Sequence, residues 1–340
     1  MKGATHGMGN KATQQPRSFN TIRRSQTKVR AKRRMTQRIV LLAMFATVAL
    51  ILISLLVLGG FAIANAIIDA PDTPNDPDTP PEHVNNIVFT QRTEHTYNVH
   101  AGPLILVNTE NEYKFPVGVS LPLISEKIVK KPNGNRIYSP VPGVEKLETK
   151  TLDAFNEMMY KYYELDEDAY FVISSAYRTT ADQEKLGSSV LPGYSDHHTG
   201  YCVAIKYQAA NHFLETDHWI YQNCYKFGFV IRYPEGKESY TKVSNYKHCL
   251  RYVGIPHATY MTQNDLCMEE YLDLLQNNYN SSTNRLSIAA ADGISYEVYY
   301  VPASNEELTT LDVPSNYTYT ISGDNRSGFI VTVTMTAPAA

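Results

Sequence analysis

The sequence predicts a mixed α/β domain on the outer side of a membrane, between an N-terminal membrane helix and a small C-terminal β domain. Three observations support this division. Residues 39–68 contain no charged side chain. Between residues 84 and 280, short apolar runs are interspersed with apolar residues at helical spacing. From Leu286 onward, apolar and aromatic residues alternate with polar ones, as in half-buried strands.

The N-terminal region has the charge pattern of a membrane anchor. Residues 1–38 carry eleven Lys or Arg and no acidic residue, and the uncharged run 39–68 follows directly. About 20 helical residues span the ~30 Å hydrocarbon core, and a basic flank stays in the cytoplasm. A cleavable signal peptide ending near Ala64-Asn65-Ala66 is the alternative, but its apolar region would exceed the usual ~7–15 residues. We therefore expect a cytoplasmic tail (1–38), a single transmembrane helix (39–68) and an extracytoplasmic remainder.

A spacer separates the predicted helix from the first domain. Residues 69–83 are rich in Pro, Asp and Thr, a composition that favours extended and solvated backbone. The basic tail is explained by membrane topology, so the sequence gives no support for nucleic-acid binding.

The domain predicted at 84–280 contains both strands and helices. Apolar runs predict strands at Leu104–Val107, Phe171–Ile173 and Phe229–Tyr233. Apolar spacing predicts helices at 151–164, 217–226 and 264–275, and a further one from Thr180, which we expect to be its N-cap. Gly228 is expected to end the 217–226 helix.

The C-terminal segment 286–340 is expected to form the small β domain. Ile294, Tyr296, Val298 and Tyr300 alternate with other residues, and the run Ser322–Gly328 supplies a turn before the apolar run 329–334. No set of catalytic residue types is found there.

Several ordered motifs lie between Gly102 and Leu275. Ser195-Asp196-His197-His198-Thr199-Gly200 is followed by Ala204 four residues later, and Arg251-Tyr252-Val253-Gly254 lies downstream. Ser175-Ala176-Tyr177-Arg178 with Gln183 precedes them. Together these blocks resemble the zinc D-alanyl-D-alanine carboxypeptidases of the VanY type. The resemblance implies an α+β fold whose central antiparallel sheet holds zinc in a groove. It also implies an enzyme that trims the terminal D-alanine from peptidoglycan stem peptides.

Residue roles follow from the same resemblance. It assigns the first zinc ligand to His197 and places Arg178 and Ser195, with Tyr177 and Gln183, around the substrate. Arginine suits a substrate carboxylate because its planar fork binds both oxygens.

The chain departs from the family pattern at the metal site. Ala204 stands where the family has a ligand Asp. Without a gap, Tyr246 replaces the catalytic Glu and Cys249 the last ligand His. With one inserted residue, Asn245 and His248 occupy those two positions instead. A catalytic zinc needs three protein ligands and a nearby base, and neither alignment restores a carboxylate base.

Two functional hypotheses follow. The first is a pseudoenzyme with no cofactor that binds a stem peptide or an envelope protein at peptidoglycan. The alternative is a zinc D,D-carboxypeptidase with a rearranged site built from His197, His198, His248 and Cys249, with Asp196 as a further candidate. A purely structural role for the β domain is a third possibility.

The four cysteines lie in the predicted extracytoplasmic part, where disulfides are permitted. They allow three pairings. The family fold implies that Cys202, on the same strand face as Ala204, lies close to Cys249. A Cys202–Cys249 disulfide across the former metal site is therefore one hypothesis, and a pair of free thiols is the other.

Overall fold

The computed structural model describes residues 87–207, 218–243 and 248–336, all of which fall in the compact unit His83–Ala340. The predicted tail, membrane helix and spacer lie outside the described residues and stay predictions. Among the residues described, no helix is long and apolar enough to cross a bilayer.

A five-stranded sheet with strand order β2-β3-β4-β6-β5 carries the family motifs. β2 and β3 are parallel, and the other three neighbouring pairs are antiparallel. The expected mainly antiparallel sheet in a mixed α+β fold is therefore present. The strands are β2 (Tyr138–Pro140), β3 (Phe171–Ser175), β4 (Cys202–Tyr207), β5 (Phe229–Ile231) and β6 (Cys249–Tyr252).

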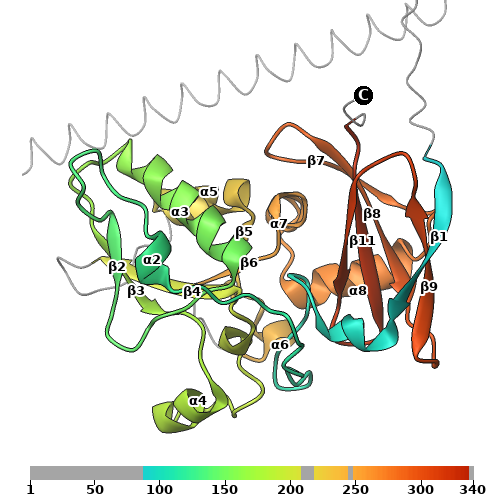
Figure 1. Cartoon of the computed structure of the whole chain (residues 1–340), viewed down its shortest axis with the longest axis horizontal. Coiled ribbons are helices and arrows are strands. Elements are labelled where there is room, and N and C mark those ends of the chain that lie inside the picture. Colours follow the sequence, from blue (N-terminus) through green and yellow to red (C-terminus); the bar gives the residue numbers. More distant parts are fainter. Residues whose placement is uncertain (1–86, 208–217, 244–247, 337–340) are drawn as a thin grey trace, which may run out of the picture. The chain divides into compact units, whose positions relative to one another are not determined.

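Helix α3 (Thr149–Tyr163) covers one face of this sheet, and α4 lies on the opposite side (Figure 1). The apolar face of α3, which includes Leu152 and Phe155, is fully buried in the cluster that contains Phe171 of β3. The Glu148 carboxylate caps the helix by accepting a 3.0 Å hydrogen bond from the Thr151 amide. The predicted helix 151–164 is confirmed, and it begins two residues earlier.

The next helices agree with the predictions apart from their ends. Helix α4 (Thr180–Leu186) is capped by Thr179, whose hydroxyl accepts from the Asp182 amide at 3.1 Å, so the predicted cap was wrong by one residue. The predicted helix 217–226 is formed by α5 (Trp219–Asn223) and the 3₁₀ helix η3 (Cys224–Phe227). It ends at Gly228, where φ is +82° and a Cβ would come within 3.0 Å of the Gly254 carbonyl carbon.

Two helices follow β6 where the sequence predicted one. Helix α7 (Ile255–Gln263) was not predicted, and it carries Pro256 in its first turn. Proline is tolerated in the first turn, since the amide it lacks would have no partner inside the helix. The second, α8 (Met268–Asn278), corresponds to the helix predicted at 264–275. The remaining helices are α2 (Ile124–Lys127), α6 (Glu238–Thr241), η1 (Thr96–His100) and η2 (Asp196–Thr199).

The C-terminal strands form an antiparallel sheet with strand order β10-β11-β8-β7. A separate pair joins β1 to β9, so a strand near the start of the expected 84–280 domain pairs with one from segment 286–340. We call β1 and β7–β11 the β module. Its strands are β1 (Phe89–His95), β7 (Leu286–Ala289), β8 (Ser295–Pro302), β9 (Leu308–Pro314), β10 (Tyr319–Gly323) and β11 (Gly328–Thr334).

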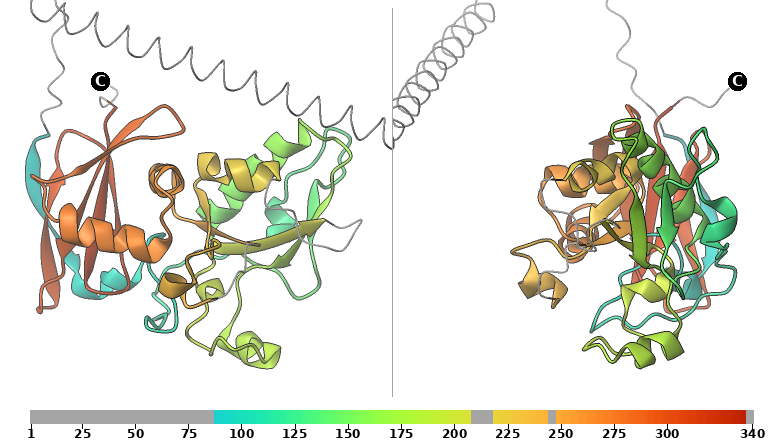
Figure 2. Two further views of the ribbon diagram at one scale, coloured as in Figure 1. Left: turned by 180° about the vertical axis from the view of Figure 1, so that it is seen from behind. Right: turned by 90° about the vertical axis from the view of Figure 1, so that its left-hand side faces the viewer.

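Helix α8 packs across the strands of this module (Figure 2). Its residues Tyr271, Leu272 and Leu275 share an apolar cluster with Val298 of β8 and Ile330 of β11. The β module is thus packed onto the helices that follow the five-stranded sheet.

The segment Leu104–Val107 is buried as expected but does not form a strand. Its polar backbone atoms are bonded elsewhere. The Leu106 amide donates to the Asp324 carbonyl at 3.0 Å, and the Ile105 carbonyl accepts from the Arg251 guanidinium at 3.0 Å. Hydrogen bonds to loops and side chains replace the hydrogen-bond ladder of a strand. The apolar run in the sequence predicts burial but does not show which partners the backbone will bond to.

Candidate active site

Three neighbouring strands bring the motif positions into one row. Ser175 of β3 pairs with Ala204 of β4, and Ala204 pairs with Cys249 of β6. His197 reaches this row from η2, the short 3₁₀ helix that precedes β4. Of the two residues that the alignments offered for the last ligand position, Cys249 lies opposite Ala204.

His197 is held in one orientation. Its Nδ1 lies 2.9 Å from the Ala176 carbonyl oxygen, which can only accept, so Nδ1 carries the proton. The other ring nitrogen, Nε2, lies 3.9 Å from the Cys249 sulfur. The Ser175 hydroxyl is 3.5 Å from Nε2. A carbonyl bond on one ring nitrogen is the arrangement by which proteins present the other nitrogen to a ligand.

The two cysteines beside His197 are in contact but not bridged. Cys202 and Cys249 are both free and fully buried, so the hypothesis of a disulfide between them is not supported by the structure. A hydrogen bond from the Cys202 thiol, together with His197, lowers the pKa of Cys249 to about 6 against the effect of burial. Burial and the same bond raise the pKa of Cys202 well above its ordinary value.

The donor atoms here do not fit a catalytic zinc site, which needs three protein ligands. His197 and Cys249 supply two donors, and Ala204 supplies none at the third family position. Within the described ranges, no three His, Cys, Asp or Glu side chains are grouped to hold a metal ion. Asn245 and Tyr246, the residues aligned with the family base, lie outside the described residues.

The other donors proposed for a rearranged site have hydrogen-bond partners of their own. His198 Nδ1 lies 2.7 Å from the Arg178 carbonyl oxygen, and His198 Nε2 accepts from the Gly193 amide at 3.0 Å. Burial lowers the pKa of His198, which favours this neutral form. His248 Nδ1 lies 3.3 Å from the Tyr221 hydroxyl. The segment that carries His198 is the 3₁₀ helix η2.

Asp196 belongs to a buried ion network that the sequence did not reveal. Its carboxylate accepts from Arg232 Nε at 2.5 Å and from Arg251 Nη1. Arg232 also donates to both oxygens of Glu269, at 2.9 and 3.0 Å. Although burial alone would raise it, Arg232 lowers the pKa of Glu269 overall. The sequence held one signal of this network, an arginine in or beside each of two apolar strands. Arg251 lies in β6, and Arg232 directly follows β5.

The network fixes the loop that carries His197. Two fully buried guanidinium groups hold the residue immediately before it, and Arg251 also donates to the Thr199 hydroxyl at 3.2 Å. Because both charges need the Asp196 carboxylate, η2 cannot move without exposing unpaired buried charge.

The predicted substrate-binding residues are partly brought together. Arg178 donates to the Ser175 hydroxyl at 2.7 Å and to the Gln183 side-chain oxygen, and its amide donates to the His197 carbonyl at 3.2 Å. Gln183 is itself fixed by a 2.8 Å bond from its amide to the Val190 carbonyl. The Ser175 hydroxyl therefore lies between the Arg178 guanidinium and the His197 ring.

Tyr177 and Ser195 are attached less directly. The Tyr177 amide donates to the Lys146 carbonyl at 3.0 Å, and the side chain is half-buried. Ser195 is buried and its carbonyl accepts from the His198 amide at 3.0 Å. Ser175, which sequence reasoning passed over, contacts both Arg178 and His197.

Comparison with known proteins agrees with this geometry. Residues 144–255 match the family model VanY: D-alanyl-D-alanine carboxypeptidase. A D-alanyl-D-alanine carboxypeptidase of Enterococcus faecium is 30% identical over 271 residues, covering 75% of this chain and 84% of that protein. The chain belongs to this family.

Two further similarities extend the comparison. A D-alanyl-D-alanine carboxypeptidase of Enterococcus faecalis is 32% identical over 134 residues, covering 32% of this chain and 49% of that protein. The crystal structure of the vancomycin resistance D,D-dipeptidase VanXYg, solved with a D-Ala-D-Ala phosphinate analog, superimposes with a TM-score of 0.61 at 23% identity. That alignment covers 73% of this chain and 99% of VanXYg, so the two chains share a fold.

Proposed function

We propose that this VanY-family protein binds the D-Ala-D-Ala end of peptidoglycan stem peptides without hydrolysing it efficiently. The 39–68 segment would anchor it to the membrane, with the described unit outside. The proposal deepens a family assignment that rests on the E. faecium relative and the shared fold.

The observation that carries the loss of hydrolysis is the row Ser175, Ala204, Cys249 facing His197. A zinc-activated water needs three ligands and a carboxylate to accept its proton. The described site offers a nitrogen and a sulfur 3.9 Å apart, with a methyl group at the third position.

Retained binding is supported by Arg178. Its guanidinium is oriented by two neutral oxygens, those of Ser175 and Gln183. A planar guanidinium fixed in this way suits the terminal carboxylate of a peptide. The neighbouring His197 lies where the family binds metal, so the scissile end of a peptide held by Arg178 would lie beside it.

The test measures zinc, turnover and binding on one preparation of the full-length protein. We expect substoichiometric zinc by elemental analysis, no D-alanine release from a pentapeptide ending in D-Ala-D-Ala, and calorimetric binding of that pentapeptide. The same pentapeptide with a C-terminal amide should bind at least about tenfold more weakly, since it lacks the charge that Arg178 pairs with.

A matched pair of variants assigns the binding to Arg178. We expect Arg178→Met to weaken pentapeptide binding about tenfold or more, and Arg136→Met, at an exposed arginine outside the site, to leave it unchanged. Stoichiometric zinc with D-alanine release would instead support the rearranged zinc carboxypeptidase. Absence of peptide binding with no turnover would point to an envelope protein as the partner.

A further inference from the structure

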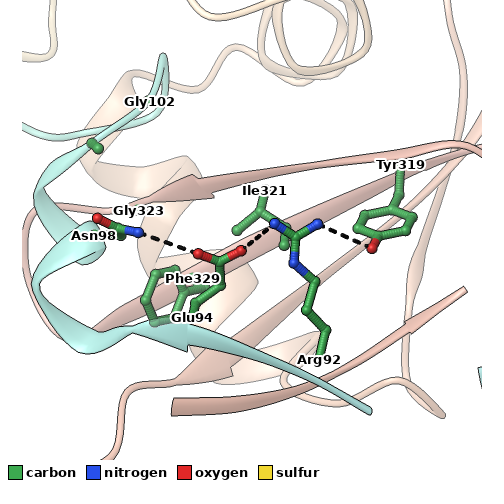
Figure 3. Close-up of a pocket in the computed structure, with 9 residues that line it drawn as sticks. Arg92, Glu94, Asn98, Gly102, Tyr319, Ile321, Gly323 and Phe329 are labelled. Carbon is green, nitrogen blue, oxygen red and sulfur yellow. Dashed lines mark hydrogen bonds and ion pairs between the residues drawn. The ribbon is translucent and has the colours of Figure 1, made fainter. Parts of the chain in front are cut away.

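The β module contains a pocket of its own, with a volume of about 320 Å³ (Figure 3). This lies at the lower end of the ~300–1,000 Å³ typical of small-molecule sites. The residues that line it come from β1, η1, β10 and β11, and the side chains that matter are Arg92, Glu94, Asn98, Tyr319, Ile321 and Phe329. None of these elements contributes to the candidate active site.

A continuous polar chain forms one wall of the pocket (Figure 3). Asn98 Nδ2 donates to Glu94 Oε2 at 3.2 Å, and Arg92 Nη2 lies 2.6 Å from Glu94 Oε1. Arg92 Nη1 then donates to the Tyr319 hydroxyl at 3.3 Å. Four side chains from three elements are therefore aligned by one another before any ligand arrives.

These four polar side chains retain both donors and acceptors for a ligand. The Tyr319 hydroxyl accepts from Arg92, so its own proton is available for donation. The Asn98 side-chain oxygen accepts no hydrogen bond from the described residues, and the Glu94 carboxylate has further lone pairs. A ligand that both donates and accepts at neighbouring atoms matches this wall, and paired hydroxyl groups do so.

Charge selects against ionic ligands. The pocket carries one cation and one anion, already paired at 2.6 Å, so a charged ligand would meet repulsion from one of them. Of the larger apolar side chains in the lining, Ile321 is half-buried and offers surface to a ligand, whereas Phe329 lies fully buried beneath it. A ring with polar edges and an apolar face fits both surfaces.

We propose that this pocket binds one ring of a neutral oligosaccharide. The ring hydroxyls would bond to Glu94, Asn98 and Tyr319, and its C–H face would lie against Ile321. The proposal adds a glycan site to the chain and is independent of the stem-peptide function, because it uses other residues. A site of this kind would let the protein hold a sugar polymer through the β module.

The experiment is calorimetric titration of the full-length protein with two neutral tetrasaccharides, one of β-linked N-acetylglucosamine and one of β-linked glucose. We expect at least one to bind. Glu94→Gln and Tyr319→Phe keep side-chain shape, and we expect them to weaken binding by about tenfold and a few-fold respectively, since a bond to a charged group is the stronger. Glu307→Gln changes an exposed carboxylate of the same module outside the pocket and should bind like the wild type.

The outcomes separate cleanly. Binding that both pocket variants weaken and Glu307→Gln preserves supports the site, and the preferred tetrasaccharide tells whether the N-acetyl groups are recognised. Failure of both tetrasaccharides to bind overturns the proposal, as does binding that the pocket variants leave unchanged. Neither result depends on pentapeptide binding, so the stem-peptide function can fail or hold separately.

Discussion

Replacement of His257 should alter the pH dependence of stability more than any other single substitution of an imidazole in the described chain. This side chain is fully buried between α7, α8 and β11. Its Nδ1 lies 2.8 Å from the Tyr271 hydroxyl and its Nε2 lies 3.0 Å from the Thr332 hydroxyl. Burial lowers the pKa of His257 from 6.5 to about 3.

The sign and size of the effect follow from linkage. The unfolded chain binds a proton at His257 near pH 6.5, whereas the folded chain does so only near pH 3. Stability from this group is therefore complete above pH 6.5 and is lost as the pH falls from 6.5 toward 3. The loss accumulates only below pH 6.5, at ~1.36 kcal/mol per pH unit, so between pH 7.5 and pH 5.0 it comes to about 2 kcal/mol.

The assay is urea unfolding of the protein at pH 7.5 and pH 5.0, for wild type and His257→Gln. The variant is less stable at pH 7.5, but it should lose about 2 kcal/mol less than wild type on acidification, because glutamine does not titrate. His95→Gln removes an exposed histidine and leaves His257 in place, so it should keep the wild-type loss. Equal losses in wild type and His257→Gln would refute the reasoning.

Three further predictions concern the site and the fold. Asp196→Asn should lower the free energy of unfolding by about 3–5 kcal/mol, because it removes the charge that both buried arginines share. Asp182→Asn changes an exposed carboxylate and should leave stability nearly unchanged, so urea midpoints that match for the two variants would contradict the network. Ala204→Asp combined with Cys249→His should raise zinc affinity at least about tenfold, because the double substitution restores three donors around one position. Equilibrium dialysis measures this, and an unchanged affinity would show that these strands no longer have the family geometry. Gly228→Ala should destabilise by about 1–2 kcal/mol in thermal unfolding, because φ is +82° there, and wild-type stability would mean that the turn relaxes.

Sequence reasoning did well where a pattern depends on nearest neighbours. The helix around Leu152 and Phe155 and the stop at Gly228 were both predicted, because apolar spacing and a left-handed glycine act locally. Strand β1 was missed, since its sequence FTQRTEH is mostly polar and the strand is stabilised by pairing with β9, more than 200 residues away. No local pattern encodes such a partner.

The site divides in the same way. His197 and Ala204 could be placed by motif alignment, whereas the alignments left the last ligand position open between Cys249 and His248. Ser175 could not be assigned, because its role depends on lying between Arg178 and His197 in space. The Cys202–Cys249 disulfide was a plausible pairing by position, yet proximity alone does not determine whether two thiols are bridged.

The sequence by itself determined the family, the mixed α+β class and the residue types at the positions aligned with the family's metal site, because these are properties of residue identity and order. Only the tertiary structure decided which partners the side chains of these residues contact. It directed Asp196 to two buried arginines and His198 to a backbone carbonyl, and it assembled the sugar-sized pocket from β1 and β10. The physical reason is that buried charges and polar groups must find partners, and those partners come from segments that are distant in the chain.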